Sequence, residues 1–99
     1  MNIKEVIQRI GYFRNKLNLS ARELSIRIGK HEGYINKLES KDFNLPTEML
    51  LNIIEALEIT PEEFFSNNYI DYQTNQDLVK LIENLPLDKK KNIIEFISN

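Results

Sequence analysis

Two short amphipathic segments flank Gly29, and this spacing constrains the fold more than any other feature of the chain. Ser20 and Glu23 form a capping box, in which each side chain can accept a hydrogen bond from the other residue's backbone N–H. Leu24 and Ile28 follow at a four-residue step and give the first segment one buried stripe. Gly29 stands where a left-handed C-cap is common. The first segment is therefore predicted to be a short helix that ends at this glycine.

The second segment is predicted to be a helix from His31 to Glu39, with Tyr34, Ile35 and Leu38 facing inward. Two helices of about eight residues, joined by a turn that contains glycine, form a helix-turn-helix pattern. Where such a pattern binds DNA, its second helix lies in the major groove.

The rest of the chain also repeats its apolar residues at helical steps, and it has no strand pattern. Pro46 and Pro61 each suit the first turn of a later helix. The fourth and fifth helices are expected to bury Met49, Leu50, Ile53, Ile54, Leu57, Phe64 and Phe65. The predicted all-α organisation is a five-helix domain over residues 1–66, a linker over 67–74 and two short helices within 75–99.

Charge is distributed unevenly along the chain. Residues 1–41 hold nine Lys and Arg against four acids, a net of +5, whereas residues 42–99 hold four lysines against eleven acids, a net of −7. Such asymmetry is expected where one half meets a polyanion such as nucleic acid, although a small protein can also divide unevenly by chance.

The sequence lacks the residues that several classes of function require. There is no cysteine for a disulfide or a thiolate, and the lone His31 excludes a multi-histidine metal site. We find no catalytic triad and no phosphate-cradling glycine loop, so we expect no enzyme and no cofactor. No apolar run approaches the roughly 18 residues of a membrane span, and no apolar export signal is present. We therefore expect a cytoplasmic protein without a membrane partner.

Seven motifs fit one register over residues 3–65: Phe13-Arg14, Leu19 to Ser25, Ile28-Gly29, Tyr34 to Glu39, Leu45-Pro46, Met49 to Leu57 and Ile59 to Phe64. Together they resemble the XRE family of phage-repressor-like helix-turn-helix proteins. The resemblance implies a five-helix phage-repressor-like domain that binds double-stranded DNA by sequence and regulates transcription, most simply as a repressor.

The resemblance also implies a major-groove surface on the outer face of the predicted third helix. That face holds His31, Glu32, Gly33, Asn36, Lys37 and Ser40. Asn36 is the strongest candidate for base readout, because its amide can pair with both N6 and N7 of adenine. The alternative for Asn36 is an ordinary solvated side chain.

Phosphate contacts are expected from three basic residues. Lys37 and Lys41 are placed to supply affinity without sequence choice. Arg22 matches a backbone-contact region of the family, at a helix N-terminus whose amides can also bind phosphate. The run of lysines at 89–91 is interpreted as a solvated helix face, and a contact with DNA is the alternative.

Four residues depart from the family pattern. Ala21 stands where glutamine is common, and Ser25 stands where alanine usually allows two helices to cross closely. Glu32 is an acid in the groove-facing turn, where it can either accept from cytosine N4 or repel the DNA backbone. Gly33 costs about 1 kcal/mol relative to alanine inside a helix, and it either allows close approach to DNA or marks weakened function.

Arg14 and Glu39 are assigned a structural role by the resemblance. In the family, these positions form a partly buried ion pair between the first helix and the end of the third. We therefore expect Arg14 to belong to the scaffold and not to the DNA-binding surface.

Residues 75–99 carry apolar stripes on too little chain to bury them, and such stripes need a partner. The hypothesis is homodimerisation through these two helices, which would match a palindromic operator whose half-sites lie about one helical turn apart. The alternative is that the helices fold back onto their own chain.

A second function stays open. The fold could serve as a protein-interaction module, such as an antirepressor or an antitoxin that neutralises a toxin. The acidic second half, Ala21 and Glu32 leave room for this alternative. DNA binding that falls steeply with salt would favour the regulator, and co-purification with another protein would favour the interaction module.

Overall fold

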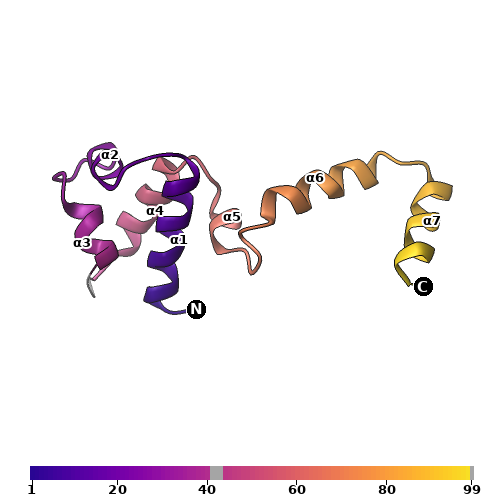
Figure 1. Cartoon of the computed structure of the whole chain (residues 1–99), viewed down its shortest axis with the longest axis horizontal. Coiled ribbons are helices and arrows are strands. Elements are labelled where there is room, and N and C mark those ends of the chain that lie inside the picture. The colour runs from indigo at the N-terminus through magenta and orange to yellow at the C-terminus, as the bar shows by residue number, and fades with distance from the viewer. Residues whose placement is uncertain (41–43, 99) are drawn as a thin grey trace. The chain divides into compact units, whose positions relative to one another are not determined.

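The computed structural model describes residues 1–40 and 44–98, and in this part of the chain it holds seven α-helices and no strand (Figure 1). The helices are α1 (Ile3–Lys16), α2 (Ala21–Arg27), α3 (Tyr34–Ser40), α4 (Thr47–Ala56), α5 (Pro61–Phe65), α6 (Tyr72–Glu83) and α7 (Leu87–Ser98). The predicted all-α fold is confirmed. The chain divides into two compact units, Met1–Phe65 and Ser66–Asn99.

The core of the first unit draws on all five of its helices. Its buried apolar side chains are Val6, Ile10, Phe13, Leu19, Leu24, Tyr34, Ile35, Leu38, Ile53, Ile54, Leu57 and Phe64. Four predicted core residues differ: Ile28, Met49 and Leu50 are only half-buried, and Phe65 is 43% exposed. Consecutive side chains on a helix point about 100° apart. Once Phe64 fills the core, Phe65 must therefore lie at its edge, where the two rings meet edge to face at 5.0 Å between centroids.

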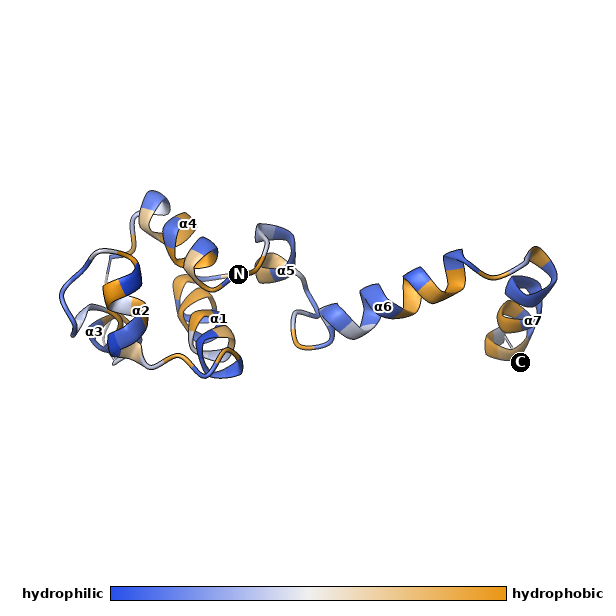
Figure 2. Ribbon diagram, turned by 90° about the horizontal axis from the view of Figure 1, so that it is seen from above, coloured by the Kyte–Doolittle hydropathy of each residue, from blue (hydrophilic) through white to orange (hydrophobic). Residues whose placement is uncertain are grey.

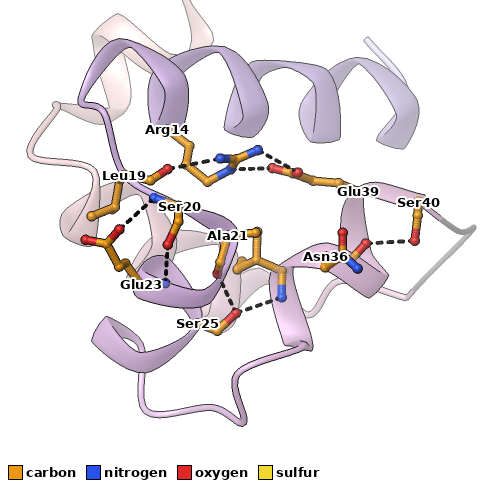
Figure 3. A network of polar contacts seen from close by, with 10 residues as sticks. Arg14, Leu19, Ser20, Ala21, Glu23, Ser25, Asn36, Glu39 and Ser40 are labelled. Carbon is orange, nitrogen blue, oxygen red and sulfur yellow. Dashed lines mark hydrogen bonds and ion pairs between the residues drawn. The ribbon is translucent and has the colours of Figure 1, made fainter.

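The capping box at the start of α2 has the predicted geometry (Figure 3). The Glu23 N–H donates to Ser20 Oγ at 3.0 Å, and the Ser20 N–H donates to Glu23 Oε1 at 3.2 Å. The Ser20 side chain, and after it the Ser20 backbone N–H, hold the pKa of Glu23 below its ordinary value. At the other end of the helix Gly29 has a φ of 75°, so the glycine fits the turn that the sequence predicted for it.

Replacing Ser20 by alanine is expected to lower the free energy of unfolding by about 1 kcal/mol through loss of the N-cap. The pKa of Glu23 should rise toward its ordinary value, which a carbon-detected NMR titration measures. Because the folded-state pKa is lowered, the stabilisation is present above the unfolded pKa and is lost as pH falls through the folded value. Thr60→Ala removes the comparable cap that accepts from the Glu63 N–H and should leave Glu23 unaffected. An unchanged Glu23 pKa in Ser20→Ala would contradict this account.

Helix α3 begins at Tyr34, three residues later than predicted. The Gly33 N–H donates to His31 Nδ1 at 3.2 Å, and the Tyr34 N–H donates to His31 O at 3.1 Å, so His31 holds a turn that precedes the helix. The prediction that Gly33 lies in a helix interior is wrong. Gly33 stands just before the first helical residue, and the cost of an interior glycine does not apply to it.

The second unit contains α6 and α7. Helix α6 starts at Tyr72, inside the stretch predicted as a linker, where Gln73 Nε2 donates to Asp77 Oδ1 at 3.0 Å across one helical turn. Neither helix has a buried residue among those described. Hydrophobic residues, coloured orange in Figure 2, recur along both helices. The most exposed of them are Leu78, Leu81, Leu87, Ile94, Phe96 and Ile97.

Candidate nucleic-acid interface

Helix α3 has one buried face and one exposed face. Ile35 and Leu38 are fully buried and Tyr34 is nearly so, which anchors the helix to the core. Burial raises the pKa of the Tyr34 hydroxyl. Asn36 and Lys37 lie on the exposed face. The helical period therefore presents the two polar side chains to solvent on a helix whose position the core fixes.

A buried hydroxyl joins α2 to α3. Ser25 is fully buried, and its Oγ donates to Ala21 O at 2.7 Å and accepts from the Ile35 N–H at 3.0 Å (Figure 3). Ile35 belongs to the first turn of α3, where backbone N–H groups lack helical partners. The sequence predicted a small side chain here, but it did not predict that serine supplies an acceptor for α3.

Ser25→Ala is expected to lower the free energy of unfolding by about 1–2 kcal/mol, because it leaves the buried Ile35 N–H without this acceptor. Chemical denaturation measures the change. Ser40→Ala is the matched control, since the exposed Ser40 hydroxyl donates to the Asn36 and Lys37 carbonyls of its own helix. Equal stability losses in the two variants would contradict the role given to Ser25.

An ion pair joins α1 to the end of α3. Arg14 Nε lies 2.9 Å from Glu39 Oε1 and Arg14 Nη2 lies 3.0 Å from Glu39 Oε2, so the contact is bidentate (Figure 3). Arg14 Nη1 also donates to Leu19 O at 3.0 Å. The two side chains are 15% and 20% exposed. All three nitrogens of the Arg14 guanidinium thus have partners inside the domain.

Arg9 is a structural residue that the sequence reading missed. The residue is 8% exposed, and its Nη1 donates to Phe64 O at 2.6 Å, which links α1 to α5. Its position offers a signal, because Arg9 stands three residues after Val6 and four before Phe13, on the buried stripe of α1. The positive charge of Arg9 therefore belongs to the scaffold of the domain and is not presented on its surface.

A shallow pocket lies between the start of α2 and the start of α3, lined by Ala21, Arg22, Glu32, Gly33 and Asn36. It brings together four of the predicted site residues. Arg22 Nε donates to Glu32 Oε2 at 3.0 Å, and the two side chains are 70% and 69% exposed. The pocket is open to solvent, and its side chains offer an amide, a guanidinium and a carboxylate as hydrogen-bonding groups.

The other predicted site residues lie around this pocket or along α3. His31 is exposed and Lys37 extends from the exposed face of the helix. Ser40 is the last residue of α3, and its hydroxyl donates to Asn36 O at 2.7 Å (Figure 3). Lys41, which the sequence predicted as a phosphate contact, lies outside the described residues.

The described residues, 1–40 and 44–98, hold neither a candidate metal site nor a candidate membrane span. No group of three or more His, Cys, Asp or Glu side chains there could hold a metal ion. No helix in the same ranges is both long enough and apolar enough to cross a membrane.

The α2–α3 motif, anchored by α1 and followed by α4 and α5, defines a helix-turn-helix domain. Residues 10–64 match the model of the helix-turn-helix family, which is more than half of the chain. The chain therefore belongs to the XRE family of helix-turn-helix proteins. Members of this family are DNA-binding transcription regulators and not enzymes. No curated protein and no solved structure matches the chain.

Proposed function

We propose that this protein regulates transcription as a repressor, by binding a specific sequence of double-stranded DNA with α3 in the major groove. The observation that carries the proposal is the exposed pair Asn36 and Lys37, beside the open pocket at the start of α3, on a helix anchored by Ile35 and Leu38. A rigid helix with an exposed polar N-terminal half is what base readout requires. Such a regulator would act in the cytoplasm, by occupying promoter DNA.

Each side chain has a proposed role. The Asn36 amide pairs with adenine, and Lys37 and Lys41 neutralise DNA phosphates. His31 and Gly33 form the turn that approaches the DNA, with Glu32 and Arg22 beside them. Ser40 can offer only its lone pairs, because its proton is directed to Asn36 O.

The second unit is proposed to form a homodimer through residues 75–99. The exposed apolar side chains of α6 and α7 support this role, since unpartnered apolar surface of this kind marks an interaction site. A two-fold dimer would present two copies of α3 to the two half-sites of a palindromic operator.

The test is selection from random-sequence DNA pools at two salt concentrations, with the wild type, Asn36→Ala and Asn52→Ala. Asn52 is an exposed asparagine on α4 and serves as the matched control. We expect a palindromic site to be enriched by the wild type and Asn52→Ala, and Asn36→Ala to lose discrimination at one base pair per half-site by roughly 5- to 150-fold. Absence of enrichment at both salt concentrations would contradict the proposal.

A protein-interaction module is the second candidate, favoured by the exposed apolar side chains of α6 and α7 in a half of the chain with an excess of acids. The fold would then hold a different protein, as an antirepressor or an antitoxin does. Stable co-purification with one such protein, together with absence of DNA enrichment, would favour this candidate over the regulator.

A further inference from the structure

The ion pair between Arg22 and Glu32 joins two separate elements at the pocket beside Asn36. Arg22 lies in the first turn of α2 and Glu32 in the turn before α3, and their side chains meet at 3.0 Å between Nε and Oε2. Both side chains are more than two thirds exposed, so the pair lies on the surface that α3 presents to solvent. An ion pair this exposed adds little to stability. Because stability does not account for the pair, its position in the pocket indicates a role in binding.

The geometry of the contact leaves one edge of the guanidinium for a ligand. Arginine carries five N–H donors in a planar fork. Glu32 Oε2 accepts from Nε, and the end of the guanidinium, where Nη1 and Nη2 each carry an N–H, makes no hydrogen bond to the described residues. Two parallel donors match O6 and N7 of guanine, the commonest specific contact in the major groove. A guanidinium held by a carboxylate also loses less rotamer freedom on binding than a free one.

We propose that Arg22 reads a guanine in each half-site, and that Glu32 is the positioning residue that directs it there. The proposal rests on the proposed function, since it names a second specificity-determining contact beside Asn36. It replaces the phosphate contact that the family resemblance implies for Arg22. Attraction to phosphate depends on net charge, so a carboxylate beside the guanidinium weakens that attraction. The two parallel hydrogen bonds that the guanidinium can donate to a base are retained.

Competition binding tests this assignment. The DNA is the duplex that the wild-type protein enriches, together with variants of that duplex that differ at single base pairs. The proteins are the wild type, Arg22→Ala, Arg22→Lys and Glu32→Ala. We expect Arg22→Ala to lower the preference for one G·C pair per half-site by roughly 5- to 150-fold. Arg22→Lys should not restore it, because an ammonium cannot replace the planar fork. Glu32→Ala should weaken the same preference while it strengthens binding to non-specific DNA, since a negative charge is removed.

A phosphate contact gives a different pattern. Arg22→Ala would then weaken binding to all sequences alike and reduce the salt dependence by about one counterion, while Arg22→Lys would restore both, and this result would overturn the inference. If the wild type enriches no site, the proposed function fails and the inference fails with it. If an Asn36-dependent site is enriched but its G·C preferences survive in all three variants, the inference alone fails.

Discussion

Replacing Arg14 by alanine is expected to lower the free energy of unfolding by about 2–4 kcal/mol. This is somewhat less than the loss of about 3–5 kcal/mol when one partner of a fully buried ion pair is removed, because both side chains are partly exposed. The substitution removes both hydrogen bonds to Glu39 and the donor to Leu19 O. It leaves the Glu39 carboxylate, which is only 20% exposed, without its guanidinium. Chemical denaturation with a linear extrapolation measures the change.

The exposed pair in the same domain supplies the control for Arg14. Arg22→Ala breaks a single contact to Glu32 and should change stability by less than about 1 kcal/mol. The cycle of Arg14→Ala, Glu39→Ala and the double variant isolates the coupling between the two side chains. If Arg14→Ala kept the wild-type stability and lost only DNA binding, Arg14 would be a DNA contact and its assignment to the scaffold would be wrong.

Charges placed on the apolar side of α7 are expected to convert a dimer into a monomer. Ile94 and Ile97 are 63% and 75% exposed and stand three residues apart, so they lie on one side of the helix. Replacing both by aspartate would bring two carboxylates into the proposed interface. Affinity for the palindromic site should fall by roughly 10²–10⁴-fold, because the two half-sites would then bind separately. Sedimentation equilibrium and DNA titration measure the two effects.

The matched control adds the same charge elsewhere on the same helix. Asn92 is an exposed polar residue of α7 that stands neither three nor four residues from Ile94 or Ile97, so it lies on another side of the helix. Asn92→Asp should leave the dimer intact, whereas the single change Ile94→Asp, which adds the same charge, should weaken it. A wild-type chain that is monomeric at concentrations that saturate the operator would contradict the dimer and favour helices that fold onto their own chain.

Local sequence signals predicted the first unit well, because its helices begin and end through short-range chemistry. The capping box of Ser20 and Glu23 acts within four residues, and Gly29 acts at a single backbone position. The start of α3 was predicted less well. There the apolar period suggested an earlier start, but the His31 side chain accepts from the Gly33 N–H and forms a turn before the helix.

The contacts that position the candidate site are harder to predict, since they join residues far apart in the chain. Arg9 reaches Phe64 O across 55 residues, and only the folded chain shows that this arginine is buried. Ser25 and Ile35 are ten residues apart, as are Arg22 and Glu32. The sequence named both members of the Arg22–Glu32 pair as site residues, but their contact depends on how the turn before α3 folds.

The most direct test of the central claim, that α3 reads DNA, is an NMR titration of the labelled full-length chain with the enriched duplex. We predict that the largest amide perturbations fall on residues 21–22 and 31–37, and that the Asn36 side-chain amide shifts with the first equivalent of the duplex. Perturbations confined to the exposed side of α4 or to residues 66–98, with none on α3, would contradict the account.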